Sequence, residues 1–116
     1  MASITVFGIP NCDTVKKARK WLDANDISYE FHDYKKKGID KKTLKSWCKE
    51  LGWDALLNRR GTTWRKLDES DKADVNETRA VDLMVEHTSM IKRPVIAHDG
   101  GLLLGFDEAH YRETLA

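Results

Sequence analysis

The sequence predicts an α/β fold, and three successive segments lead to this prediction. A short apolar, β-branched run, Ile4–Phe7, ends at Gly8, as a buried strand would. Residues 14–25 then carry apolar side chains at helical spacing, and residues 27–32 alternate between apolar and polar. A strand, a helix of about a dozen residues and a second strand form a βαβ unit. Its two strands should therefore be parallel, with a right-handed crossover between them.

The middle of the chain predicts helices. Asp40 can cap a helix that runs to Leu51 and stops at Gly52. Its apolar side chains, Leu44, Trp47, Cys48 and Leu51, share one face. A second helix is predicted over residues 75–87. This block, about residues 40–90, would be inserted between the second and third strands.

The C-terminal part predicts a hairpin and a closing helix. Residues 95–97 form a short apolar strand, residues 99–101 form a turn, and residues 102–104 form the returning strand. Asp107 can cap a helix over residues 108–115. With the helical insertion set aside, the order is βαβ-ββα. This is the order of a thioredoxin-like domain.

Length and composition indicate one domain over residues 1–116. The 20 basic residues against 19 acidic ones give no reason to expect a nucleic-acid or membrane surface. No apolar run approaches the ~20 residues of a membrane span, and no signal-peptide centre precedes the early charges. No metal-ligand spacing is present. We therefore expect a cytoplasmic protein, monomeric and without a metal.

Cys12 is the candidate nucleophile. It lies among Asn11, Asp13 and Thr14 in a polar loop before the first helix, where N-terminal amides favour thiolate over thiol. The alternative is a small, inert filler, but inert cysteines usually lie in apolar segments. Val15 stands where a Cys-x-x-Cys pair would place its second thiol, so a resolving thiol must come from glutathione or another protein.

Arginines and a proline could complete the site. The thioredoxin-like order places a cis-proline before the third strand, beside the thiol, so Arg93-Pro94 would lie there and Arg93 would hold a thiolate or an anion. An ordinary surface arginine is the alternative. Arg59 and Arg60 offer a second anion contact, or only a solvated basic loop. Asn11 and Thr14 are further binding candidates. We expect Cys48 to be a core residue and the four tryptophans to pack between the helices and the sheet, although Trp64, which follows the Arg59-Arg60 loop, could instead line the cleft.

Several longer motifs point to a known family. They are Phe7-Gly-Ile-Pro-Asn-Cys-Asp-Thr14, Lys16-Lys-Ala-Arg19, Phe31-His-Asp-Tyr34, Leu51-Gly-Trp53, Ala55-Leu-Leu-Asn58, Arg60-Gly-Thr-Thr-Trp-Arg-Lys-Leu67 and Ile91-Lys-Arg-Pro94. With them the chain resembles the arsenate reductase ArsC/Spx superfamily nearly end to end, and most closely its small YffB-type branch. The resemblance implies a thioredoxin-like core with a helical insertion.

The resemblance also implies an activity. In similar reductases the cysteine matching Cys12 attacks arsenate, and glutathione and glutaredoxin take over the adduct. Arg93 matches the arginine before the cis-proline, whereas Asn58 and Gly105-Phe106 stand where two further oxyanion arginines would be. We therefore expect a glutathione-dependent thiol-disulfide reductase, with glutathione as co-substrate, glutaredoxin as a partner and no bound cofactor.

Two alternatives stay open. One is an arsenate reductase coupled to glutathione and glutaredoxin. The other is a non-catalytic regulator like Spx that binds RNA polymerase. Many Spx-type proteins carry Cys-x-x-Cys, and Val15 removes that switch here.

Overall fold

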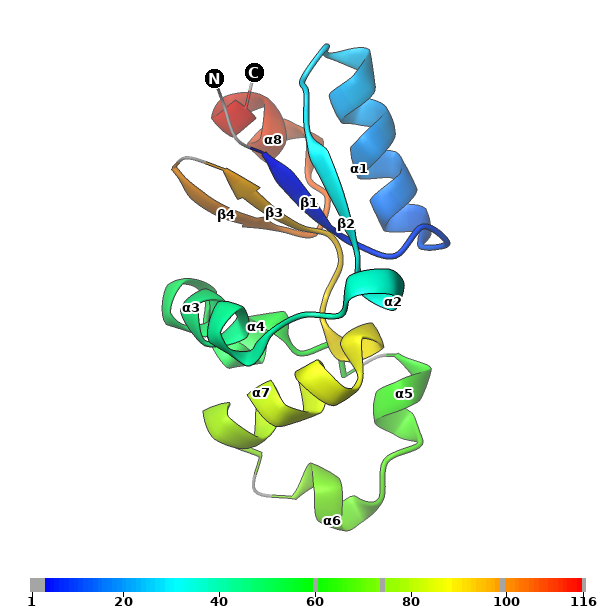
Figure 1. Cartoon of the computed structure of the whole chain (residues 1–116), viewed down its shortest axis with the longest axis vertical. Helices are drawn as coiled ribbons and strands as arrows, with labels where there is room; N and C mark the ends of the chain where they lie inside the picture. Colours follow the sequence, from blue (N-terminus) through cyan, green and yellow to red (C-terminus); the bar gives the residue numbers. More distant parts are fainter. Residues whose placement is uncertain (1–3, 60, 74, 99, 116) are drawn as a thin grey trace. The chain divides into compact units, whose positions relative to one another are not determined.

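The computed structural model describes residues 4–59, 61–73, 75–98 and 100–115. Within it the chain forms two compact units, coloured along the sequence in Figure 1. The sheet unit comprises Met1–Lys37 and Arg93–Ala116, and the helical unit comprises Gly38–Lys92. Among the described residues, no helix is both long and apolar enough to cross a membrane.

The sheet unit is built on four strands. They are β1 (Thr5–Gly8), β2 (Glu30–Asp33), β3 (Val95–His98) and β4 (Gly101–Leu104), in the order β2-β1-β3-β4. β1 runs parallel to β2, whereas β1 with β3 and β3 with β4 are antiparallel. Helix α1 (Asp13–Ala24) links the parallel pair, α2 (Tyr34–Lys37) follows β2, and α8 (Glu108–Leu115) closes the chain. This mixed sheet confirms the predicted α/β, thioredoxin-like fold.

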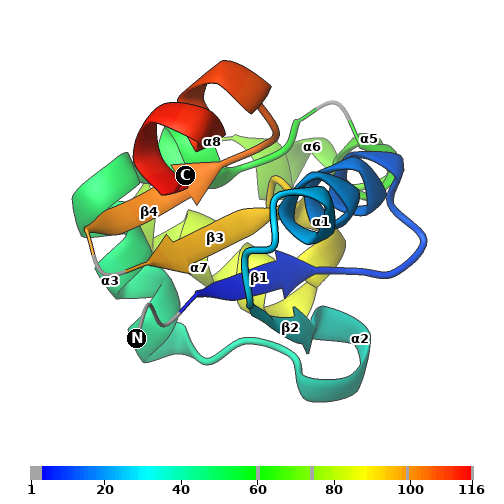
Figure 2. The ribbon, with the colours of Figure 1, turned by 90° about the horizontal axis from the view of Figure 1, so that it is seen from above.

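Helices α1 and α8 cover one face of this sheet, as Figure 2 shows from above. Alternate strand residues point to that face and meet the apolar sides of both helices. The buried cluster consists of Ile4, Val6, Ala18, Trp21, Leu22, Ile96, Leu103 and Tyr111. Within it, the rings of Trp21 and Tyr111 meet edge to face, 5.6 Å apart. Helix α1 is thereby packed against the sheet.

The helical unit contains α3 (Lys41–Leu51), α4 (Trp53–Leu56), α5 (Thr62–Arg65), α6 (Glu69–Lys72), α7 (Glu77–Glu86) and the 3-10 turn η1 (Thr88–Met90). The predicted ends of α3 are confirmed. Asp40 accepts a hydrogen bond from the Thr43 N–H (2.7 Å), and Gly52 follows the helix with a φ of 88°. Helices α3 and α4 pack against α7.

One predicted boundary is wrong. β2 begins at Glu30 and not at Ile27, because the register pairs Glu30 with Thr5 at the start of β1. The Ile27 N–H instead donates to the Leu22 carbonyl at the end of α1. Helix α7 begins at Glu77 and ends at Glu86, inside the predicted residues 75–87. Asn76 caps it, since its side chain accepts from the Arg79 N–H (2.9 Å).

Candidate functional site

Cys12 occupies the N-cap position of α1. Its backbone is extended (φ −94°, ψ 124°), and its carbonyl accepts the first helical hydrogen bond, from Lys16 (2.9 Å). The Cys12 N–H donates to the Ile9 carbonyl (3.3 Å), which tightens the loop between β1 and α1. The thiol is partly exposed. Because Cys12 is the N-cap residue, its thiol lies near the backbone N–H groups of the first turn, which have no partner within the helix.

Gly8 allows α1 to begin directly against the end of β1. A Cβ atom at Gly8 would lie 2.8 Å from Cγ2 of Val15, closer than such atoms approach in real proteins. Val15 is fully buried in the first turn of α1, so it cannot move aside freely. The missing side chain of Gly8 therefore helps to set the position of the turn that carries Cys12.

The strand register brings Arg93 and Pro94 to the same edge of the sheet. Val95 lies opposite Phe7 in an antiparallel pair, so the residues before Val95 continue beside the chain that leaves β1. The Arg93-Pro94 peptide bond is cis, as the thioredoxin-like order predicted. The Pro94 carbonyl accepts a hydrogen bond from the Gly105 N–H (2.8 Å), which ties this segment to the end of β4.

The surroundings of Cys12 favour its thiolate. Burial alone would raise the pKa of the Cys12 thiol, but the Val15 N–H, the Arg93 guanidinium and the Thr14 N–H together lower it below its usual value. Arg93 acts both as a hydrogen-bond donor and as a positive charge. The neutral thiol makes no capping hydrogen bond of its own. The two amides therefore act mainly on the charged form, which is the form that reacts.

The other candidates in the sheet unit contribute unequally. Thr14 offers its backbone N–H to the sulfur. Asn11 is exposed on the loop and makes no hydrogen bond to any described residue. The structure thus brings Cys12, Thr14 and Arg93-Pro94 together, with Asn11 beside them in the chain.

Arg59 belongs to the helical unit and has partners there. Its guanidinium pairs with Asp54 (2.8 Å) and lies 5.5 Å and 5.9 Å from the ring centres of Trp53 and Trp64. With Asp54, Asn58 and Lys92 it lines a pocket of about 310 Å³, in which the carboxylate of Asp54 already pairs with its charge. Arg60 lies outside the described residues.

The tryptophans do not all pack as expected. Trp21 lies between α1, α8 and the sheet, and Trp47 is buried within the helical unit. Trp53 and Trp64 are only partly buried. For these two the expectation of core packing is wrong, because both rings lie against the exposed Arg59 side chain.

Cys48 has the opposite character to Cys12. It is buried in α3, with 4% of its surface exposed. Burial raises the pKa of its thiol, and the negative charge of Glu77 raises it further. Cys48 is therefore a core residue, as the sequence predicted.

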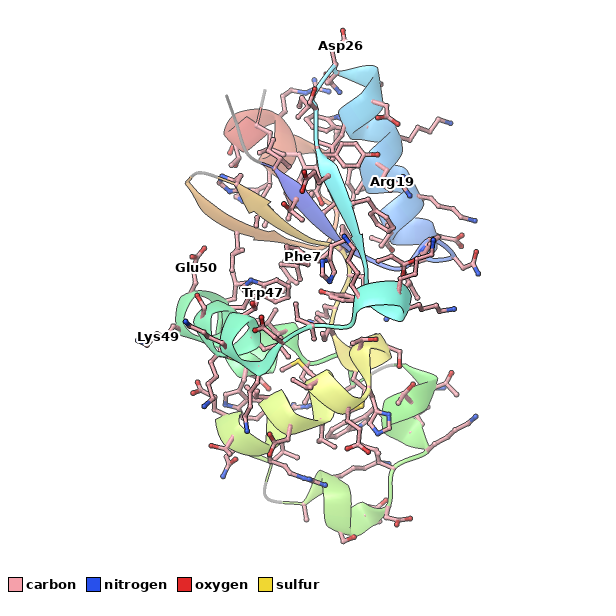
Figure 3. The ribbon with its side chains drawn as sticks, in the orientation of Figure 1. Phe7, Arg19, Asp26, Trp47, Lys49 and Glu50 are labelled. Atoms are coloured by element: carbon pink, nitrogen blue, oxygen red, sulfur yellow. The ribbon has the colours of Figure 1, made fainter. Side chains whose placement is uncertain are left out.

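A groove of about 640 Å³ lies elsewhere in the sheet unit, lined by Arg19, Asp23, Asp26, Ile27, Ser28, Tyr29 and Phe31. Figure 3 labels Arg19 on α1 and Asp26 at the turn after α1, at the opposite end of the helix from Cys12. No cysteine is among the residues that line this groove, so its size gives no reason to place thiol chemistry there. Within the described part of the chain, no three His, Cys, Asp or Glu side chains gather as metal ligands would.

Sequence reasoning missed Tyr34. This residue follows β2 at the same edge of the sheet, is 2% exposed, and lies within electrostatic range of Arg93. It was visible only as the last residue of the Phe31–Tyr34 motif. The strand pairing could have pointed to it: Tyr34 comes directly after β2, and the partner of β2, β1, leads into the Cys12 loop.

Residues 7–114 match the model of the ArsC family. Among solved structures, one named YFFB protein is 52% identical, with a TM-score of 0.96, and the match covers 98% of this chain and all of that one (100%). An arsenate reductase (ArsC) related protein from Brucella melitensis is 50% identical, with a TM-score of 0.77, over 97% of this chain and 93% of that one.

Sequence relatives also span nearly the whole chain. An uncharacterized protein of Haemophilus influenzae is 47% identical over 97% of this chain and 99% of its own length. A global transcriptional regulator Spx of Streptococcus pyogenes is more distant, at 26% identity over 97% of this chain and 85% of its own length.

Proposed function

The chain belongs to the ArsC family, and from this membership we propose that it is a glutathione-dependent thiol-disulfide reductase. The observation that carries the proposal is the setting of Cys12, a partly exposed thiol at the first turn of α1 whose pKa is lowered by helix amides and Arg93. A thiolate at neutral pH is the attacking species in disulfide exchange. The family includes reductases, which agrees with this chemistry.

The proposed reaction proceeds in three exchanges. The Cys12 thiolate attacks one sulfur of an oxidised substrate, forms a mixed disulfide and releases the other sulfur as a thiolate, which takes up a proton. A glutathione thiolate then attacks the Cys12 sulfur of this mixed disulfide, which releases the second substrate sulfur as a thiolate and leaves Cys12 bound to glutathione. A second glutathione thiolate attacks the glutathione sulfur of that adduct, which yields oxidised glutathione and returns Cys12 as a thiolate. In total, two glutathione molecules are oxidised for each disulfide reduced to two thiols.

The second thiol must come from outside the protein. Position 15 is valine, and Cys48 is buried with a raised pKa, so neither supplies a resolving thiolate. Glutathione or a glutaredoxin fits this need. Arg93 would attract a carboxylate of glutathione as well as stabilise the thiolate. Asn11, Thr14 and Pro94 would line its path.

The test combines reactivity with identification of the adduct. The rate of Cys12 alkylation against pH gives the thiol pKa, and mass spectrometry after incubation with oxidised glutathione shows which cysteine gains a glutathione. We expect a midpoint below the ordinary value of about 8.5 and a single adduct on Cys12. A midpoint near 8.5 without an adduct, or an adduct on Cys48, would contradict the proposal.

Arsenate reduction is the second candidate. Arg93 beside a nucleophilic sulfur suits an oxyanion, and the Brucella melitensis protein that is 50% identical is described as related to arsenate reductase. NADPH consumption that depends on arsenate, with glutathione, glutaredoxin and glutathione reductase present, would support it. If neither this assay nor the disulfide assay shows turnover, a protein-binding role like that of Spx is favoured instead.

A further inference from the structure

The hydroxyl group of Tyr34 lacks a partner within the described part of the protein. Tyr34 is 2% exposed, and its hydroxyl oxygen is closed to solvent and makes no hydrogen bond to any described residue. A buried polar group without a partner destabilises the folded state, so native proteins contain few of them. Phenylalanine would fill the same space without this cost, which indicates a use for the hydroxyl.

The strand register places Tyr34 at the edge of the sheet from which the Cys12 loop emerges. Asp33 lies opposite Gly8 at the end of the parallel β1–β2 pair, so Tyr34 follows on one side of the chain leaving β1. Arg93 precedes β3 on the other side of that chain. Tyr34 and Arg93 therefore flank the segment that leads from β1 to Cys12.

Neighbouring rings hold Tyr34 in place. Its ring centre lies 6.3 Å from that of Phe7, labelled on β1 in Figure 3, and 5.9 Å from that of His32. Phe7 and His32 are themselves direct partners in the β1–β2 register. The phenol ring is thus packed against two side chains that come from the paired strands β1 and β2.

The electrostatic setting keeps the hydroxyl protonated. Burial raises the pKa of the Tyr34 phenol far above its usual range, and the positive charge of Arg93 offsets only part of this rise. Tyr34 is therefore a hydrogen-bond donor at every pH at which the protein would work. A neutral donor next to a guanidinium group is a combination that suits a carboxylate.

We propose that Tyr34 and Arg93 form a carboxylate-binding subsite beside Cys12, in which the Tyr34 hydroxyl donates a hydrogen bond and Arg93 supplies the charge. The identity of the ligand as glutathione, a peptide with two carboxylates, rests on the proposed function. Because the hydroxyl is closed to solvent, the carboxylate reaches it when a neighbouring side chain turns. Arg93 is the neighbouring charged side chain and is partly exposed, so a movement of this side chain would open the path.

The test measures binding without disulfide chemistry. S-methylglutathione keeps both carboxylates but has no thiol, and its affinity for the full-length protein can be measured by isothermal titration calorimetry. We expect Tyr34→Phe to weaken this binding about tenfold, since a hydrogen bond to a charged group is lost. The diethyl ester of S-methylglutathione, which lacks the charged carboxylates, should bind both proteins equally.

A matched variant and a stability measurement separate binding from folding. Tyr29→Phe removes the hydroxyl that accepts from Arg19 (3.1 Å) in the groove at the other end of α1, and should leave the affinity unchanged. Tyr34→Phe should melt at the same temperature as the wild type or higher, because an unpartnered buried hydroxyl has been removed.

The outcomes are distinct from those for the reductase. Equal affinity of wild type and Tyr34→Phe for S-methylglutathione overturns the subsite, as does absence of saturable binding to the wild type. An equal loss for the diester also overturns it, since the effect would then be structural. Weakened binding of S-methylglutathione alone supports the subsite, even if Cys12 gains no glutathione from oxidised glutathione and the reductase proposal fails.

Discussion

The two cysteines of this chain lie at opposite ends of two similar helices. Cys12 precedes the first turn of α1 in the sheet unit, and Cys48 lies in the last turn of α3 in the helical unit. The pKa of the Cys12 thiol is lowered and that of the Cys48 thiol is raised. Burial acts in the same direction on both, so it does not explain the difference.

The difference comes from the dipoles and charges around each sulfur. At Cys12, two backbone N–H groups and a guanidinium group face a developing negative charge. At Cys48, the charge that acts on the thiol is the negative one of Glu77, which raises its pKa. One thiol is therefore prepared for nucleophilic chemistry and the other for packing.

Exchange of each sulfur for oxygen should separate the two roles most strongly. Cys12→Ser should abolish glutathione adduct formation and disulfide reduction, because a hydroxyl is not ionised at neutral pH, with little change in stability. Cys48→Ser should keep the adduct but lower the free energy of unfolding by about 1–3 kcal/mol, because a hydroxyl is buried among apolar groups. Mass spectrometry and urea unfolding measure the two effects. Loss of the glutathione adduct in Cys48→Ser at unchanged stability would contradict the assignment of Cys48 to packing.

Removal of the cation should bring Cys12 closer to an ordinary thiol. In Arg93→Gln we expect the midpoint of the alkylation rate against pH to move to higher pH and the rate at pH 7 to fall about tenfold, since an opposite charge beside the thiolate is lost. Arg93→Lys keeps the charge and should retain most of the shift. If both variants match the wild type, the helix amides alone account for the reactivity of Cys12.

A methyl group at Gly8 should disturb the first turn of α1. Gly8→Ala places a Cβ atom 2.8 Å from Val15 Cγ2, which should cost about 1–3 kcal/mol of stability and slow Cys12 alkylation. Val15→Ala removes the clashing atoms, so in the double variant the two stability losses should be less than additive. Strict additivity would show that the close approach of β1 and α1 does not set the position of Cys12.

Stability against pH should show slopes of opposite sign for the two cysteines. Because the pKa of Cys12 is depressed in the folded state, its contribution is present above the unfolded pKa of about 8.5 and is lost as pH falls through the folded pKa. Because the pKa of Cys48 is raised, its contribution is complete below about 8.5 and is lost as pH rises through the folded pKa. Urea unfolding of the wild type and of each serine variant from pH 6 to 10 measures both contributions. Each contribution is the difference in the free energy of unfolding between the wild type and that variant. Slopes of the same sign would contradict the assignment.

The fold could be predicted where the signals are local. Asp40 and Gly52 mark the ends of α3 because a cap and a left-handed residue act on their immediate neighbours. The hairpin of β3 and β4 follows from two apolar runs with a turn between them. The start of β2 could not be predicted from the alternation at Ile27, because the length of β1, its partner, decides where pairing begins.

The candidate site was predictable to a smaller extent. Cys12 stands out in sequence because polar residues surround it before a helix. Arg93 could be placed beside it only through the thioredoxin-like order, and Trp53 and Trp64 do not pack as expected because Arg59 lies against their rings. Tyr34 was missed because nothing in its own neighbourhood shows that its hydroxyl is buried without a partner.

Local order along the chain was sufficient to specify the βαβ-ββα pattern, a single accessible thiol and the absence of a second thiol three residues later. These features depend on neighbours within one helix or strand, whose periodicity and caps are written in adjacent residues. The chemistry of Cys12 was decided by tertiary structure. Its thiolate is stabilised by a cation 81 positions away in the sequence, from Cys12 to Arg93, which only the pairing of β1 with β3 brings to the same edge. Electrostatic interactions act through space, so their strength depends on that pairing and not on distance along the chain.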